Sequence, residues 1–415
     1  MKTVRPRVAA GLLFYSAIKV IFVIQTLTDM RKICIATGTR AEWGLLSPIA
    51  KALKNRDDVQ LQIIATNMHL MPKYGETWKQ IVADGFDIDF KVPMPEDTDT
   101  PGNTARAMSI ALAGFADAFE ALHPDMLVIL GDRYEMLAVA SAALIFRIPI
   151  VHIAGGEISE GAYDDSIRHA ITKMSHLHLT ETEDYRRRVI QLGENPDTVF
   201  NTGAIGVHNI LNLPLLSHEE IEAETGVKIN ENTVLVTFHP ATLDSKSPEV
   251  QCRNMLAALE SHRECNFIFT YPNNDTNGAV IIRLIEEFKA KNPDRVAIFR
   301  SLGQIRYFSV LKYAGAVVGN SSSGIIEVPS IGIPTLNIGI RQQGRIAAAS
   351  VFHCGVSESE IKAGLDKILS PEVRELARKK KNPYFTPNTL EKMVDIICNT
   401  SFEKIKHFYN IKFNG

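Results

Sequence analysis

From Lys32 onward, short apolar runs alternate with helical patterns, and this alternation limits the folds that the chain can adopt. The runs "KICIAT", "VQLQIIAT" and "DMLVILGD" are typical of buried strands, and "AEWGLLSPIAKALK" places four apolar side chains on one face of a helix. Successive units of this kind form a parallel sheet with helices on both faces. The pattern restarts after "GAIGVHNILNLPLL". We therefore predict an α/β protein with two Rossmann-like domains whose parallel sheets face a cleft.

The chain has 415 residues, which is more than one hydrophobic core usually holds. We expect the two domains to cover residues 30–208 and 209–385, and the helix within 386–415 to pack back on the first domain. Residues 1–29 resemble a signal or anchor segment, but Lys19 interrupts the apolar stretch and no clear small-residue cleavage site follows. We expect this segment to lie outside the fold, with translation starting at Met30.

Composition excludes several classes of protein. The chain has 45 basic and 47 acidic residues, so no field of one sign attracts nucleic acid. Five cysteines, odd in number and without a CxxC pair, indicate a reducing, cytoplasmic compartment. Fingerprints for dinucleotides, for ATP phosphates, for a serine nucleophile and for zinc are absent. His152 alternates within a buried strand, and we interpret it as a core residue.

Two carboxylates follow neighbouring predicted strands. Asp132 ends "VILGD", and Glu157 ends "HIAGGE" 25 residues later, about the length of one right-handed βαβ unit. Parallel strands finish at one edge of the sheet, where open α/β sheets bind ligands, so the pair indicates a site. The alternative is that these carboxylates cap helices or pair with Arg133 and Arg168.

The stretch "YDDSIRHA" adds Asp164 and Asp165 directly before an amphipathic helix, together with Arg168 and His169. Aspartate is a preferred N-cap residue, so one of the pair can cap the helix while the other points into the cleft. Carboxylates held close together raise one another's pKa, which provides an acid/base system near neutral pH.

The stretch "GNSSSGIIEV" indicates a phosphate site where a strand opens into a helix. Ser321 and Ser322 supply N–H and hydroxyl donors there, and Glu327 can accept hydrogen bonds from the two hydroxyls of a ribose. Arg341 and Arg345 of "GIRQQGR" are candidate partners for a diphosphate or a nucleobase. The alternative is a serine-rich capped turn.

Four further polar side chains follow strand ends. His239 and Asn273 come after strands of the second domain, and Arg40 and His69 come after the first two strands of the first domain. A single histidine is more often structural than catalytic, but all four fall on the edge where ligands bind.

These stretches together resemble the hydrolysing UDP-N-acetylglucosamine 2-epimerases that make N-acetylmannosamine for sialic acid synthesis. The matching motifs run from Met30 to the C-terminus and include "GTRAEWG", "GDRYE", "HIAGGE", "DDSIRHAITKMSHLHLT", "GNSSSGIIEVPS" and "NIGIRQQGR". The resemblance implies a glycosyltransferase-B type fold, with UDP held mostly by the C-terminal domain. It also implies a UDP-sugar substrate, neither metal nor another cofactor, and a homo-oligomer (dimer or tetramer).

The resemblance further implies a role for each matching residue. The acid/base carboxylates would be Asp132, Glu157 and Asp165. His69 would lie near the sugar, and UDP would be bound by Arg40, Arg133, His239, Asn273, Ser321, Ser322, Glu327 and Arg341.

The implied reaction converts UDP-N-acetylglucosamine and water to N-acetylmannosamine and UDP, by elimination to 2-acetamidoglucal and then hydration. Inversion at C-2 requires acid/base groups on both faces of the sugar ring. A relative that hydrolyses UDP-2,4-diacetamido-2,4,6-trideoxyhexose for legionaminic acid synthesis is an alternative. A non-hydrolysing epimerase, a glycosyltransferase and a catalytically silent nucleotide-sugar sensor are the others.

Overall fold

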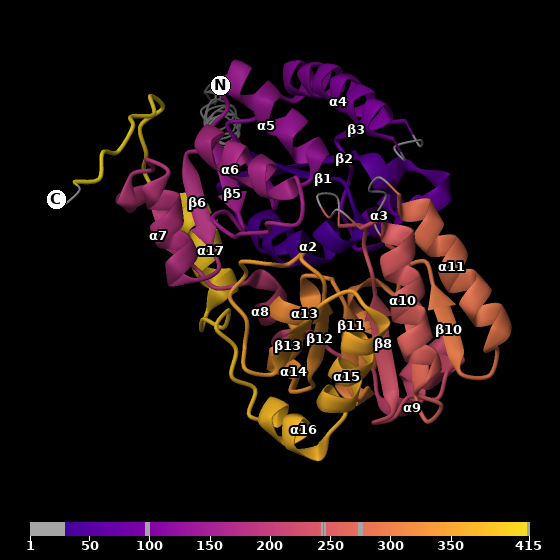
Figure 1. Ribbon diagram of the computed structural model, residues 1–415. Coiled ribbons are helices and arrows are strands. Elements are labelled where there is room, and N and C mark those ends of the chain that lie inside the picture. Colours follow the sequence, from indigo (N-terminus) through magenta and orange to yellow (C-terminus); the bar gives the residue numbers. More distant parts are fainter. Residues whose placement is uncertain (1–29, 96–99, 242–243, 245, 273–276, 413–415) are drawn as a thin grey trace, which may run out of the picture.

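The computed structural model describes residues 30–412, apart from 96–99, 242–243, 245 and 273–276. The N-terminal extension predicted for residues 1–29 lies outside the described residues. Two α/β domains are stacked on each other, the first in indigo to magenta and the second in rose to yellow (Figure 1). None of the helices in the described ranges combines the length and apolar character that a membrane crossing needs.

The first domain contains a seven-stranded parallel sheet with the order β3-β2-β1-β4-β5-β6-β7. The direction of strand addition reverses between β1 and β4, and a crevice for ligands opens at such a switch point. The strands are β1 (Arg31–Thr37), β2 (Val59–Thr66), β3 (Phe90–Val92), β4 (Met126–Leu130), β5 (Ile150–Ile153), β6 (Leu177–Thr180) and β7 (Val199–Asn201).

Helices cover both faces of this sheet, so its central strands are apolar on both sides. Cys34 and Ala36 of β1 face one core with Phe115 of α4, whereas Ile33 and Ile35 face the other. The helical elements are α2 (Arg40–Lys54), η1 (Asn67–Leu70), η2 (Pro72–Tyr74), α3 (Trp78–Ala83), α4 (Pro101–Leu122), α5 (Tyr134–Ile145), α6 (Asp164–Met174), α7 (Glu183–Gln191) and η3 (Pro196–Thr198).

The second domain repeats this architecture with a six-stranded parallel sheet in the order β10-β9-β8-β11-β12-β13. Its switch point lies between β8 and β11. The strands are β8 (Thr233–Thr237), β9 (Asn266–Thr270), β10 (Val296–Phe299), β11 (Ala316–Gly319), β12 (Thr335–Ile338) and β13 (Val351–Cys354).

The helices of the second half of the chain pack on both faces of this sheet and link the two domains. They are α8 (Ile205–Asn212), α9 (His218–Thr225), α10 (Pro248–Glu260), α11 (Gly278–Lys291), α12 (Gly303–Tyr313), α13 (Ser323–Ile326), α14 (Val328–Ile331), α15 (Glu358–Ile368) and α16 (Pro371–Arg378). The predicted fold class, two parallel-sheet domains of the glycosyltransferase-B type, is confirmed.

The chain returns to the first domain at its C-terminal end. Helix α17 (Thr389–Asn399) places Met393 and Ile397 in the same core as Trp43 of α2. Figure 1 shows this yellow helix beside the indigo and magenta elements. The two domains are therefore connected twice, at α8 and at the segment before α17.

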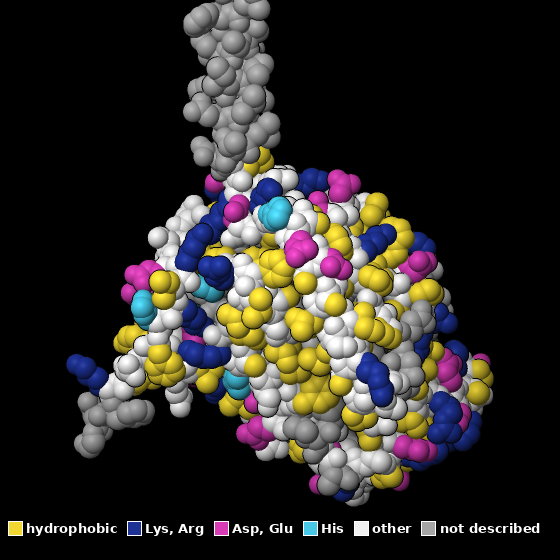
Figure 2. Space-filling view, turned by 90° about the horizontal axis from the view of Figure 1, so that it is seen from above, with side chains coloured by type: hydrophobic (Ala, Val, Ile, Leu, Met, Phe, Trp, Pro, Cys, Tyr) yellow, Lys and Arg dark blue, Asp and Glu magenta, His cyan; other side chains and the backbone are white. Residues whose placement is uncertain are grey.

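Exposed apolar side chains gather on the outer face of the first domain. Figure 2 looks down on the face that carries α4 and α5 and shows yellow side chains spread across it. Ile110 and Leu112 of α4, and Leu144 and Ile145 of α5, are exposed. The homo-oligomer predicted from the family resemblance stays a prediction.

The segment after α17 is fastened to the end of α6 by a buried carboxylate. Glu194 accepts bonds from Lys173 (2.7 Å), His178 (3.1 Å) and Lys406 (2.6 Å). Lys406 also donates to the backbone carbonyls of Lys173 and Ser175 at 2.6 Å. Burial alone would raise the pKa of Glu194, but these partners outweigh it and hold the pKa at about 2.

We predict that Glu194→Gln lowers the free energy of unfolding by about 2 kcal/mol at neutral pH, because three donors lose a charged acceptor. Urea titration measures the change, and Glu120→Gln on the exposed face of α4 serves as the control. Because the folded pKa is depressed, the contribution of Glu194 is present above its ordinary pKa and is lost as the pH falls toward 2. Equal stability of both variants at neutral pH would contradict a stabilising role for this carboxylate.

Candidate active site

Two adjoining cavities lie between the domains, at the carboxyl edges of both sheets. The larger has a volume of 310 Å³ and is lined mostly by loops of the second domain. The smaller has a volume of 170 Å³ and is lined mostly by the first domain. Both cavities are lined by Thr39, Ala41, Leu45, Ser322 and Arg341. A ligand with two different ends can therefore occupy both.

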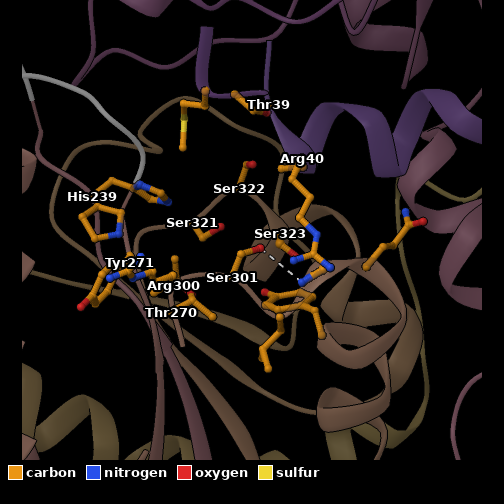
Figure 3. Close-up of a pocket in the computed structure, with 18 of the residues that line it drawn as sticks. Thr39, Arg40, His239, Thr270, Tyr271, Arg300, Ser301, Ser321, Ser322 and Ser323 are labelled. Carbon is orange, nitrogen blue, oxygen red and sulfur yellow. Dashed lines mark hydrogen bonds between the residues drawn. The ribbon is translucent and has the colours of Figure 1, made fainter. Parts of the chain in front are cut away.

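The larger cavity is surrounded by polar side chains that follow strand ends of the second sheet. Figure 3 shows His239, Tyr271, Arg300 and Ser321 around it, with Arg40 reaching in from the start of α2. Arg40 approaches Gly303, whose φ is +67°, so closely that a Cβ there would collide with the guanidinium. Glycine at this position permits both the left-handed backbone and the approach of the first domain.

An amide side chain fixes the two loops at the switch point of the second sheet. Asn320 accepts from the N–H of His239 at 2.7 Å and donates to the carbonyl of His239 at 2.8 Å. The carbonyl of Asn320 accepts from Arg341 at 3.2 Å and from Gln342 at 2.8 Å. Burial, reinforced by Arg341 and Arg133, keeps the pKa of His239 well below its usual range, so its ring is neutral.

Glu327 is a carboxylate set into the wall of the larger cavity, 8 % exposed. Burial raises its pKa to about 7, so it titrates near physiological pH. Ser321 and Ser322 lie on the same wall, before α13. Their hydroxyls and the Arg341 guanidinium suit a phosphate, and Glu327 suits a hydroxyl donor.

A buried guanidinium draws the carboxylates of the first domain together. Arg168 is fully buried, and its closest ionic contact is Asp132; Asp165 and Glu157 lie 3.6 Å and 3.9 Å away. Arg168 also donates to the Ser159 hydroxyl at 2.9 Å. The carboxylates therefore converge at one edge and also pair with Arg168, which combines the two alternatives that the sequence leaves open.

The three carboxylates differ in their access to the smaller cavity. Asp132 lines it, and its side chain is 22 % exposed. The side chain of Glu157 is 3 % exposed and lies behind the lining. Asp165 accepts from the N–H of Ser159 at 2.6 Å, while Asp164 lines the cavity. Of the three predicted acid/base groups, Asp132 is thus the one that lines the smaller cavity, whereas Asp165, with a side chain 27 % exposed, does not.

The second domain contributes a cation to this cluster. Nη2 of Arg345 lies 2.5 Å from Oε2 of Glu157, and both side chains are buried. The loop that carries Arg345 packs on the first domain: the N–H of Glu160 donates to the carbonyl of Gln343 at 3.1 Å. A Cβ on Gly161 would lie 2.5 Å from the carbonyl oxygen of Ile340. The ion pair is therefore part of the closed contact between the domains.

The remaining predicted residues have varied positions. Arg133 lines the smaller cavity and donates to Glu135 at 2.6 Å. His69 lines neither cavity: it is 0 % exposed and bonded to the hydroxyls of Thr37 and Thr77 at 3.1 and 2.8 Å. Asn273 lies outside the described residues.

Two groups of the site were not selected from the sequence as site residues. Arg168 was considered only as a partner of the carboxylates. Glu181 is buried and directly follows β6, the strand next to β5. The position of Glu181 at the end of a strand was the signal in the sequence that could have identified it. Within the described ranges, no three His, Cys, Asp or Glu side chains are grouped as metal ligands.

The fold and the paired cavities define a protein of the glycosyltransferase-B type. The sequence pattern described as UDP-N-acetylglucosamine 2-epimerase matches residues 51–398. The chain belongs to this family, within its hydrolysing UDP-sugar 2-epimerases, as the motifs predicted.

Relatives support this assignment. The chain is 41 % identical to the GDP/UDP-N,N'-diacetylbacillosamine 2-epimerase (hydrolyzing) of Campylobacter jejuni, over 83 % of this chain and 89 % of that protein. It is 39 % identical to the polysialic acid biosynthesis protein P7 of Escherichia coli, over 92 % of this chain and 98 % of that protein. It is 34 % identical to the UDP-N-acetylglucosamine 2-epimerase of Neisseria meningitidis serogroup B, over 78 % and 84 %.

Solved structures share the fold. A UDP-GlcNAc 2-epimerase from Neisseria meningitidis bound to UDP-GlcNAc superimposes with a TM-score of 0.74 at 18 % identity, over 89 % of this chain and 100 % of that one. A co-structure of Staphylococcus aureus MnaA with UDP superimposes with a TM-score of 0.72 at 16 % identity, over 89 % of this chain and 96 % of that one.

We predict that Arg345→Gln lowers the free energy of unfolding by about 3 kcal/mol, because Glu157 loses its nearest cation in a buried position. Urea titration of both proteins measures the difference. Arg187→Gln removes a guanidinium that is 72 % exposed on α7 and changes stability by less than about 0.5 kcal/mol. If Arg345→Gln loses no more free energy of unfolding than this control, the ion pair between Arg345 and Glu157 does not stabilise the fold.

Proposed function

We propose that this protein is a hydrolysing 2-epimerase of a UDP-linked 2-acetamido sugar. One observation carries the proposal: Asp132 lines the smaller cavity, which shares Ser322 and Arg341 with the larger one. A nucleotide diphosphate in the larger cavity thus places its sugar beside the carboxylates. Family membership supports the same reaction class.

In this proposal the larger cavity binds UDP. Ser321, Ser322 and Arg341 hold the diphosphate, and Glu327 accepts from the ribose hydroxyls. Arg40, His239 and Asn273 complete the nucleotide contacts, with Arg133 between nucleotide and sugar. These donors stabilise the negative charge that develops on UDP as it leaves.

The chemistry proceeds in two steps. A base removes the proton at C-2, the electron pair forms the C-1–C-2 double bond, and the C-1–oxygen bond breaks, so that UDP leaves as an anion and 2-acetamidoglucal remains. Water then adds at C-1, and a proton returns to C-2 from the opposite face. We assign Asp132, Glu157 and Asp165 to these proton transfers, because inversion requires groups on both faces.

We propose UDP-N-acetylglucosamine as the substrate, giving N-acetylmannosamine and UDP for sialic acid synthesis. The 39 % identity to a polysialic acid biosynthesis protein over 92 % of the chain supports it. The second candidate is UDP-N,N'-diacetylbacillosamine, a 2,4-diacetamido-2,4,6-trideoxy sugar nucleotide. Two relatives, at 41 % and 36 % identity, favour this candidate, because their names give N,N'-diacetylbacillosamine as the substrate.

Incubation with each sugar nucleotide in deuterated water, followed by NMR, tests the proposal. We expect free UDP and a free 2-epimer that carries deuterium at C-2. The UDP-linked 2-epimer would instead indicate the non-hydrolysing reaction. UDP binding without turnover of either compound would favour a nucleotide-sugar sensor, and transfer to an added acceptor would favour a glycosyltransferase.

We predict that Asp132→Asn lowers kcat by about 100-fold or more, because the amide cannot take up a proton from the sugar. UDP affinity, measured by calorimetry, changes by less than about threefold, since Asp132 lines only the sugar side. Asp117→Asn on the exposed face of α4 keeps the wild-type kcat. A wild-type kcat in Asp132→Asn would remove this residue from the mechanism.

We predict that UDP affinity depends on the ionisation of Glu327. Its pKa of about 7 is raised by burial, so the carboxylate that accepts from ribose is present above this pH and is lost below it. Between about pH 8 and about pH 6, UDP affinity should fall roughly tenfold more in the wild type than in Glu327→Gln. Parallel pH profiles of the two proteins would contradict the ribose contact.

A further inference from the structure

Glu181 is a buried carboxyl group that the proposed chemistry does not use. It follows β6, and β6 lies next to β5 in the first sheet. Glu181 and Glu157 therefore leave neighbouring parallel strands at the same carboxyl edge. Glu181 lines neither cavity, so a ligand there does not contact it directly.

The carboxyl groups of Glu181 and Glu157 face each other closely enough to form a hydrogen bond. Oε1 of Glu157 and Oε2 of Glu181 are buried, and no N–H or hydroxyl group of the described residues donates to either. An ionised carboxylate can only accept, so a bond between two carboxyl groups requires a proton on one of them. One shared proton would satisfy both of these buried oxygens.

The charges around the pair fix where this proton resides. Arg345 contacts Oε2 of Glu157 at 2.5 Å and stabilises a negative charge there. Burial first, and then the charge of Glu157, raise the pKa of Glu181 well above its usual range. The other groups that face the pair are Arg168 from α6, Tyr185 from α7, Tyr384 before α17, and Glu327. The proton thus rests on Glu181, beside an ionised Glu157.

We propose that Glu181 is a positioning residue of the acid/base system, sharing one proton with Glu157 inside the closed contact between the domains. When Glu157 acts as an acid, the O–H bond of Glu181 breaks, the proton moves to Glu157 and from there forms the C–H bond at C-2, and Glu181 becomes the carboxylate. A proton taken up by Glu157 and passed to Glu181 restores the pair. The inference rests on the proposed function, in which Glu157 transfers protons. It explains how a carboxylate without solvent contact obtains one.

Glu181→Gln tests the proposal, because the amide keeps the shape and can donate to Glu157 but holds no transferable proton. We expect kcat to fall about tenfold or more near neutral pH, with KM unchanged within about twofold. The rate of the wild type should fall as rising pH removes the shared proton. The variant holds no such proton, so this alkaline limb should be displaced or absent.

The matched control is Glu183→Gln, two residues along, whose side chain is 47 % exposed and pairs with Arg186 and Arg187 of the same helix. It should keep the wild-type kcat and pH profile. An unchanged kcat and an unchanged alkaline limb in Glu181→Gln would overturn the proposal, because a purely structural carboxyl group gives that result.

Infrared spectroscopy provides a readout that needs no substrate. At about pH 9, where Glu327 with its pKa of about 7 is ionised, the wild type should show the carbonyl stretch of a protonated carboxylic acid that Glu181→Gln lacks. Absence of this band in the wild type would overturn the proposal whatever the kinetics. If the wild type turns over no UDP-sugar, the proposed function fails, and the band alone decides whether the proton is shared.

Discussion

The charge of Arg168 is the constraint on which the arrangement of the site depends. Its side chain is 1 % exposed, and a buried guanidinium is tolerated only when carboxylates and hydrogen-bond acceptors surround it. The first domain meets this requirement with the loops after β4 and β5 and the first turn of α6, which supply Asp132, Glu157 and Asp165. Two segments, the loop after β4 and the stretch from β5 into α6, are thus held in one place by a single cation.

Contact between the domains extends this cluster. Arg345 reaches Glu157 across the cleft, and Arg40 reaches toward Gly303 in the opposite direction. Each domain therefore completes the cavity that the other mainly forms. In the proposed mechanism, the contact between the domains places the nucleotide beside the carboxylates and also supplies the cation that pairs with Glu157, which links substrate enclosure to proton transfer.

The sequence predicted those features that depend on strand order and chain direction. Polar residues after strand ends gather at the switch points of both sheets, so Asp132, Ser322 and His239 line the cleft. It could not predict which side chains turn inward. The ring of His69 is enclosed by two threonine hydroxyls, and Glu157 lies behind the cavity wall, because tertiary packing decides both orientations. Pairing of Arg345 with Glu157 needs the relative placement of two domains, which local patterns do not encode.

The central claim is that the carboxylate cluster breaks the bond between the sugar and its oxygen rather than a bond to phosphorus. Turnover of the accepted UDP-sugar in ¹⁸O-labelled water, followed by mass spectrometry of both products, tests this directly. We expect unlabelled UDP and a labelled C-1 hydroxyl on the free sugar, because water adds to the glucal. Label in the terminal phosphate of UDP would mean attack at phosphorus and would contradict the claim.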